Sequence, residues 1–319
     1  MQIRSIHISF SFLRVMLLSC AFVLLSCTKQ EHGDGHAIGF SSPQLKSVIN
    51  APSDIERFSV WGRYNDTEDI LVGEVVYRNA YNAFVYDDTQ YWREGRVYDF
   101  YAVHPARTTY NAYTAAAVDD AGNISVEGFD VSTQNDLMIA RSEGLTFVDD
   151  GTAPEPVSFR FSHLLTNVGF SFVKDPANDE EIEIKNIQLT GVRQKGSYDR
   201  LGWTLDPATF TLTTEELTED NALSKDESQR LVISTLMLPQ TVNGSSVSLT
   251  VNFVVTRNVG GYLEATPMTR TTVMPAGTWG IAEKITYKAA IGVNYNITFS
   301  KPIVESWSPQ QSGGTIIIK

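Results

Sequence analysis

Ser246-Val247-Ser248-Leu249-Thr250-Val251-Asn252-Phe253 alternates polar and apolar side chains without interruption. Successive side chains of a β-strand point to opposite faces, so this period of two predicts a strand with one buried face. Residues 58–61 and 97–103 repeat the pattern. Val, Thr, Tyr and Phe are frequent in these runs, and such side chains suit a pleated, half-buried surface. Strands are therefore expected near both ends of the chain.

Turn signals separate these runs at the spacing of hairpins. Residues 120–123 (Asp-Ala-Gly-Asn) and Asn243-Gly244 are combinations that favour tight turns. No long stretch shows the 3.6-residue apolar period of an amphipathic helix. Many short strands without crossover helices predict an all-β protein built from β-sandwiches with Greek-key or hairpin connections.

An acidic segment with two prolines divides the chain. Residues 149–156 are Asp-Asp-Gly-Thr-Ala-Pro-Glu-Pro, and the apolar pattern restarts at Val157. Proline lacks the backbone N–H that a strand ladder uses, so this segment cannot extend a sheet. We therefore predict an N-terminal sandwich over residues 37–152 and a C-terminal sandwich over residues 153–319.

The N-terminus has the features of a lipoprotein signal peptide. Arg4 and Arg14 precede a mainly apolar stretch of 12 residues (15–26), whereas a transmembrane helix needs about 20. Leu24-Leu25-Ser26-Cys27 resembles the bacterial lipobox, in which the cysteine is acylated and the peptide is cut just before it. Leu17-Leu18-Ser19-Cys20 has the same four residues but leaves few apolar residues after Arg14. A plain secretory signal is the alternative.

Removal of the signal peptide, residues 1–26, changes the thiol content and the charge. The chain has 2 cysteines, Cys20 and Cys27, so the mature protein keeps one and forms no internal disulfide. The net charge of −12 becomes −14, because two basic and no acidic residues leave. This charge argues against nucleic acid and anionic membrane surfaces as partners. Membrane attachment would come from acyl chains on Cys27, joined to the folded part by a flexible tether over residues 27–36.

Residues that could carry catalysis or bind a metal are few. The chain has no G-x-S-x-G motif, no phosphate-binding glycine loop and no cysteine–histidine pair. We expect no enzyme activity, no cofactor and no metal site. His32, Asp34 and His36 have the spacing of metal ligands but lie in the tether, and residues 119–123 lack the ligand spacing of a known calcium loop. A carbohydrate platform is an alternative to core packing for six aromatic residues: Trp61, Tyr64, Tyr91, Trp92, Tyr98 and Tyr101.

Several motifs occur in an order that resembles one known family. After the lipobox come residues 37–40 (AIGF), 58–62 (FSVWG), 98–105 (YDFYAVHP), 136–140 (DLMIA), 157–168 (VSFRFSHLLTNV), 238–240 (LPQ), 295–299 (YNITF) and 304–307 (VESW). Together they resemble the fimbrillin-like lipoproteins of the Bacteroidales, and they extend over nearly the whole mature chain. Each motif alone is weak, and it is their order that carries the resemblance.

The resemblance implies two tandem transthyretin-like β-sandwiches and a role as a pilus subunit. In this family, lipidated precursors reach the outer membrane, and a trypsin-like protease removes the first strand. The C-terminal strand of another subunit then fills the groove that opens. The expected localisation is the outer membrane and the surface fimbrium. The expected partners are other fimbrial subunits in a homo- or heteropolymer, with a host protein or glycan as a further partner.

The resemblance also suggests residues for each step. The displaced strand would be residues 36–42, and the basic cut site would be Lys46 or Arg57, with Lys46 favoured because it lies in a linker. The donor strand would lie within residues 313–319, where Ile316, Ile317 and Ile318 follow two glycines. A stalk or tip subunit needs a cut site and a donor strand. The alternatives are an anchor subunit that keeps its lipid and first strand, and an adhesin that binds glycans or host proteins without polymerising.

Overall fold

The computed structural model describes residues 35–42, 44–45, 55–65, 68–107, 112–219, 221–226 and 230–307. This part of the chain consists of β-strands and one 3₁₀ helix, η2 (Val131–Thr133), with no α-helix. The all-β prediction is confirmed. Within the same residues, no helix is long and apolar enough to cross a bilayer. The described residues from Ala37 onwards form one compact unit.

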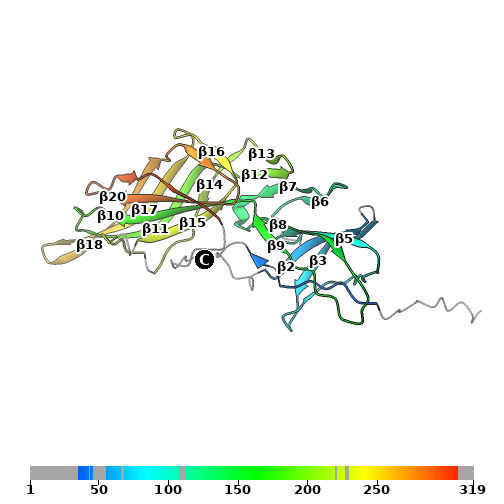
Figure 1. Cartoon of the computed structure of the whole chain (residues 1–319). Coiled ribbons are helices and arrows are strands. Elements are labelled where there is room, and N and C mark those ends of the chain that lie inside the picture. The colour runs from blue at the N-terminus through cyan, green and yellow to red at the C-terminus, as the bar shows by residue number, and fades with distance from the viewer. Residues whose placement is uncertain are drawn as a thin grey trace, which may run out of the picture. The chain divides into compact units, whose positions relative to one another are not determined.

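A seven-stranded sheet contains most of the N-terminal strands. Figure 1 shows β2, β3, β5, β8 and β9 of this sheet side by side in blue to green. The full order across the sheet is β1 (Gln44–Leu45), β9 (Arg160–His163), β8 (Met138–Thr146), β5 (Val97–His104), β2 (Arg57–Tyr64), β3 (Glu68–Arg78) and β4 (Phe84–Val85).

The central strands of this sheet are buried on both faces. Along β2, Phe58 and Val60 belong to one buried cluster, which we call the first core, and Trp61 belongs to another, the third core. Along β5, Phe100 and Tyr101 divide between the same two cores. Neighbouring side chains point to opposite faces of a sheet. The sheet is therefore covered on both sides, although the alternation along residues 58–61 and 97–103 predicted only one buried face for each strand.

Two further sheets enclose the second core. One has the order β15 (Leu231–Met237), β10 (Thr166–Lys174), β20 (Glu283–Ile291) and β21 (Ile297–Phe299), and β22 (Ile303–Ser306) also pairs with β20. The other has the order β14 (Thr209–Thr213), β11 (Glu181–Arg193), β17 (Ser248–Val259) and β18 (Tyr262–Val273). Along β17, buried and half-buried residues alternate from Ser248 to Val255, as the sequence pattern predicted. Inward side chains from both sheets form one cluster, so this half has a sandwich-like arrangement.

Two small sheets complete the fold. One contains β13 (Gly202–Leu205), β12 (Lys195–Asp199), β7 (Ile124–Asp130) and β6 (Ala115–Val118), and the other pairs β16 (Gln240–Val242) with β19 (Gly277–Trp279). The pairing of β7 with β12 joins segments from the two predicted domains. The third core lies in the same region and combines residues that are far apart in sequence, including Val103, Phe129, Leu165, Leu238 and Trp307.

The predicted boundary between residues 152 and 153 does not coincide with the change of core. Val157, Phe159 and Phe161 belong to the first core, and β9 pairs with β8. The chain enters the second core only at Val168. The two prolines interrupt a strand locally, but pairing between distant segments determines which core the next strand joins. Residues 157–163, which we assigned to the C-terminal domain, therefore belong to the N-terminal sheet and core.

Candidate functional site

Residues 37–42, which we call the N-terminal segment, lie between two other segments as an inserted strand. On one side the Ile38 N–H donates to the Gln90 carbonyl over 2.8 Å. On the other side the Val157 N–H donates to the Gly39 carbonyl over 2.8 Å, and the Ser41 N–H donates to the Val157 carbonyl over 2.9 Å. The segment is thus held by main-chain hydrogen bonds along both edges, in a groove formed by residues 84–91 and 157–159.

Two side chains of the N-terminal segment enter the core. Ile38 is 1% exposed and Phe40 is 5% exposed, whereas Gly39 and Ser41 are half-buried and the two end residues, Ala37 and Ser42, are exposed. The Phe40 ring stacks on Phe159 with the centroids 5.9 Å apart and the planes at 10°. Three further rings meet it at steep angles: Phe58 at 6.4 Å, Phe100 at 5.9 Å and Tyr86 at 5.5 Å. Phe40 therefore completes an aromatic cluster in the first core.

Tyr86 supplies the polar contact at the base of the groove. Its hydroxyl donates to the Ile38 carbonyl over 2.9 Å and accepts a bond from the Gln90 N–H over 3.0 Å. Burial raises the pKa of the Tyr86 hydroxyl above 10.0, so the group keeps its proton and remains a donor. The role of Tyr86 is not predictable from the sequence, because Phe84-Val85-Tyr86 resembles any strand and nothing local distinguishes its hydroxyl.

The strand pairing of this region continues beyond the segment. In β1, Gln44 and Leu45 pair in parallel with Arg160 and Phe161 of β9. Lys46, the favoured cut site, follows Leu45 directly in the sequence but lies outside the described residues, as do Cys27 and the isoleucines Ile316, Ile317 and Ile318. A cut after Lys46 would leave the N-terminal segment and β1 on the N-terminal side of the break, and both walls of the groove on its C-terminal side.

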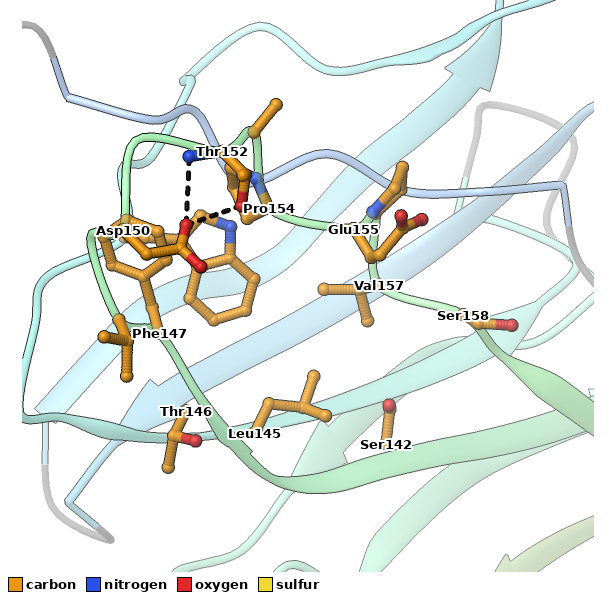
Figure 2. Close-up of a pocket in the computed structure, with 14 residues that line it drawn as sticks. Ser142, Leu145, Thr146, Phe147, Asp150, Thr152, Pro154, Glu155, Val157 and Ser158 are labelled. Atoms are coloured by element: carbon orange, nitrogen blue, oxygen red, sulfur yellow. Dashed lines mark hydrogen bonds between the residues drawn. The ribbon is translucent and has the colours of Figure 1, made fainter.

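A cavity of about 480 Å³ lies beside residues 152–158, which continue into one wall of the groove (Figure 2). Leu145 and Val157 point into it from its two sides, and the Asp150 carboxylate accepts bonds from the Thr152 N–H and hydroxyl over 2.9 and 2.6 Å. Strands β8 and β9 pair at Met138 and Ile139, and the cavity occupies the space where the chain turns away from β8. Val157, which lines the cavity, is held by its two main-chain bonds to Gly39 and Ser41 of the N-terminal segment.

Arg57, the second candidate cut site, lies within the sheet. It is the first residue of β2 and pairs with Tyr77 of β3, and its carbonyl lies 3.1 Å from the His104 Nδ1 atom. The neighbouring Glu56 carbonyl accepts a bond from the Arg78 N–H over 2.7 Å. A protease needs the peptide in an extended form with free edges, so these contacts disfavour cleavage at Arg57.

His104 gives the first core a dependence on pH. Burial lowers the pKa of its imidazole below 6.5, although the Arg57 carbonyl and the Asp136 carboxylate act in the opposite direction and His163 adds to the lowering. Because the folded protein binds this proton more weakly than the unfolded chain does, neutral His104 stabilises the folded state above pH 6.5, and this stabilisation is lost as the pH falls below that value.

We expect the free energy of unfolding to decrease between pH 7.5 and pH 5.5, and to decrease less in His104→Asn. Denaturant titrations at both pH values test this, and an equal decrease in both proteins would contradict it.

His163 is a core residue and not part of a catalytic group. Its ring stacks on Trp307 with the centroids 3.7 Å apart and the planes at 4°, and its Nδ1 atom lies 2.7 Å from an Asp136 carboxylate oxygen. Trp307 is 4% exposed, and its backbone N–H donates to the Ala282 carbonyl over 2.7 Å. These contacts fix the end of β22 against the third core.

The other residues considered for ligands have structural roles. Asp119 accepts bonds from the Asn123 backbone and side chain, and the Arg63 guanidinium donates to the Asp119 and Asp120 carbonyls. These hydrogen bonds stabilise residues 119–123 as a hairpin turn. Among the described residues, no group of three or more metal-binding side chains occurs. Of the six aromatic residues considered for a sugar platform, Trp61, Tyr64, Trp92, Tyr98 and Tyr101 are buried, and Tyr91 is 52% exposed.

Comparison with known proteins agrees with this architecture. The model of the family described as fimbrillin-like matches residues 52–307, which is most of the chain. The chain belongs to the fimbrillin-like family. The resemblance seen in the sequence motifs is thus confirmed. Because fimbrillin-like proteins are structural subunits and not enzymes, the chain is not an enzyme, and it has a pilus-related role at the cell surface.

Solved structures from the Bacteroidales share the fold. A fimbrial protein from Bacteroides vulgatus is 17% identical with a TM-score of 0.59, and the match covers 86% of this chain and 100% of that one. A candidate cell adhesion protein from Bacteroides uniformis is 18% identical with a TM-score of 0.52 (88% and 100% covered), and another from Bacteroides ovatus is 15% identical with a TM-score of 0.55 (87% and 99% covered). No curated protein matches the chain. At these identities the likeness extends to the fold alone.

Proposed function

We propose that this fimbrillin-like protein is a pilus subunit, of the stalk or the tip, which is exported as a lipoprotein and polymerises by donor-strand exchange after proteolysis. One observation carries the proposal: Ile38 and Phe40 fill a groove whose walls belong to other parts of the chain. Once the link after β1 is cut, the N-terminal segment is held by non-covalent contacts that a strand from another subunit can reproduce. An added strand satisfies the main-chain groups of both walls, and its alternate side chains fill the pockets.

The geometry of exchange favours a filament. The donor strand and the groove are different surfaces of one subunit, so each contact leaves a free groove or donor at either end. Such heterologous contacts continue until a subunit lacks one of the two surfaces. An anchor subunit would keep its N-terminal segment and lipid, and would therefore end the filament at the membrane.

Cleavage at the proposed site distinguishes a polymerising subunit, which is cut, from an anchor subunit, which is not. We expect the N-terminus on intact cells to lie just after Lys46, and the substitution Lys46→Gln to leave the longer chain. Arg57→Gln should not change processing, because Arg57 is paired within β2. Mass spectrometry of the N-terminal peptide of each variant makes the measurement. A retained lipid-bearing Cys27 in the unmodified protein would favour the anchor, and cleavage blocked only by Arg57→Gln would reverse the assignment.

Acylation of Cys27 is the part of the proposal that concerns export and membrane attachment. We expect Cys27→Ala to abolish acylation, because the other cysteine, Cys20, lies within the predicted signal peptide. The unprocessed or soluble precursor should accumulate, and membrane fractionation with labelled fatty acid detects both effects. Cys20→Ala is the matched control and should leave labelling intact. Normal labelling in Cys27→Ala would show that the lipobox assignment is wrong.

A further inference from the structure

The inference here rests on the proposed function and concerns which strand replaces the N-terminal segment. We infer that the groove is built for a donor with an aliphatic residue followed, two positions later, by an aromatic residue. Such a donor comes from a different kind of subunit, and it is preferred over the C-terminal tail of a second copy of this chain.

The aromatic preference follows from the pocket that Phe40 occupies. The pocket is lined by the rings of Phe58 in β2, Phe100 in β5, Tyr86 and Phe159. All four belong to parts of the chain that remain after the proposed cut. One ring lies nearly parallel to Phe40 and three are steeply inclined, which are the arrangements that aromatic pairs prefer. An isoleucine in this pocket would lose these contacts and leave part of the volume empty.

The position of the aromatic residue is set by the backbone. The Tyr86 hydroxyl and the Gln90 carbonyl bond to the carbonyl and the N–H of Ile38. They therefore place one donor residue at the Ile38 position whatever its side chain, and the aromatic pocket then receives the residue two positions later. A Cβ atom built on the intervening Gly39 would approach no neighbour more closely than Pro156, at 3.9 Å. The intermediate residue can therefore carry a side chain.

The tail of this chain lacks the aromatic residue. Residues 308–319 are SPQQSGGTIIIK, in which the only large apolar side chains are the three isoleucines. If Ile316 took the position of Ile38, Ile318 would enter the pocket of Phe40. The tail would satisfy the backbone of both walls but would underfill the aromatic pocket. Its better acceptor is the groove of another subunit, and a donor with the pattern of residues 38–40 fits this one better.

A peptide-exchange experiment tests the inference on the full mature chain. A site for a sequence-specific protease is inserted after Lys46, so that cutting leaves the N-terminal segment bound without a covalent link. A fluorescent peptide of residues 36–45 then reports exchange. Four unlabelled peptides compete: residues 36–45, the same peptide with Phe40→Ile, residues 308–319, and the tail peptide with Ile318→Phe. The uncut protein is the control and should bind none of them.

We expect the Phe40→Ile substitution to lower the affinity of the first peptide for the groove about tenfold or more. The Ile318→Phe substitution should raise the affinity of the tail peptide by a similar factor. Tyr86→Phe in the protein should lower the affinity for all four peptides to a similar extent, because the Tyr86 hydroxyl donates to the backbone of the bound strand and not to a side chain. A tail peptide that binds as tightly as its Ile318→Phe form would overturn the inference while leaving strand exchange intact. Failure of every peptide to enter the cut protein would remove the proposed function as well.

Discussion

Replacing Phe40 with alanine will lower the free energy of unfolding by about 3–5 kcal/mol, the range measured when a buried phenylalanine is truncated. Phe40 is 5% exposed and contacts four aromatic rings of the first core. Truncation removes these contacts and leaves a cavity that strand pairing on both edges prevents from collapsing. The measurement is denaturant unfolding of the mature chain before any cut after Lys46.

A matched control uses an aromatic residue outside the core. Tyr81 is 91% exposed, so Tyr81→Ala should change the unfolding free energy by no more than about 0.5 kcal/mol. The Phe40→Ala chain should also release its N-terminal segment faster after cutting, since less apolar surface holds it. A loss no greater than that of Tyr81→Ala would mean that residues 37–42 contribute nothing to the first core, and the groove would no longer be a candidate for exchange.

Deleting residues 313–319 will leave a folded subunit that is absent from fimbriae. The fold should persist because the chain is fixed at Trp307, six residues before the deletion, by burial and by stacking on His163. The three isoleucines of the tail cannot all point to one side of a strand. In the groove of another subunit both sides can be covered, at about 1.5–3 kcal/mol for each fully buried isoleucine.

The deletion is best compared with a chain of unchanged length. Substituting serine for Ile316, Ile317 and Ile318 keeps the reach of the tail but removes the apolar side chains, and it should also prevent incorporation. Isolated fimbriae are probed for the subunit, and thermal unfolding of the purified monomer shows that each variant is folded. If the truncated subunit still enters filaments, donation by this segment is wrong, and the anchor role becomes the better proposal.

The strand composition and the family could be predicted from the sequence because both depend on local pattern. Alternation along residues 246–253 is a property of neighbouring residues, and β17 has the corresponding burial pattern. The order of short motifs was enough to identify the fimbrillin-like family, although each motif describes ordinary core packing. The short apolar run at residues 37–40 was also visible, and the structure places Ile38 and Phe40 in the first core.

Long-range pairing accounts for what the sequence could not show. The prolines at 154 and 156 suggested a boundary, but Val157 bonds to Gly39 across more than a hundred residues and thereby joins the first core. Tyr86 and Trp307 were likewise indistinguishable from other strand aromatics until their partners, Ile38 and His163, were known. Local sequence determined that strands form and which of their faces are apolar. The tertiary structure alone decided which strands meet, because that choice depends on contacts between residues that the sequence keeps far apart.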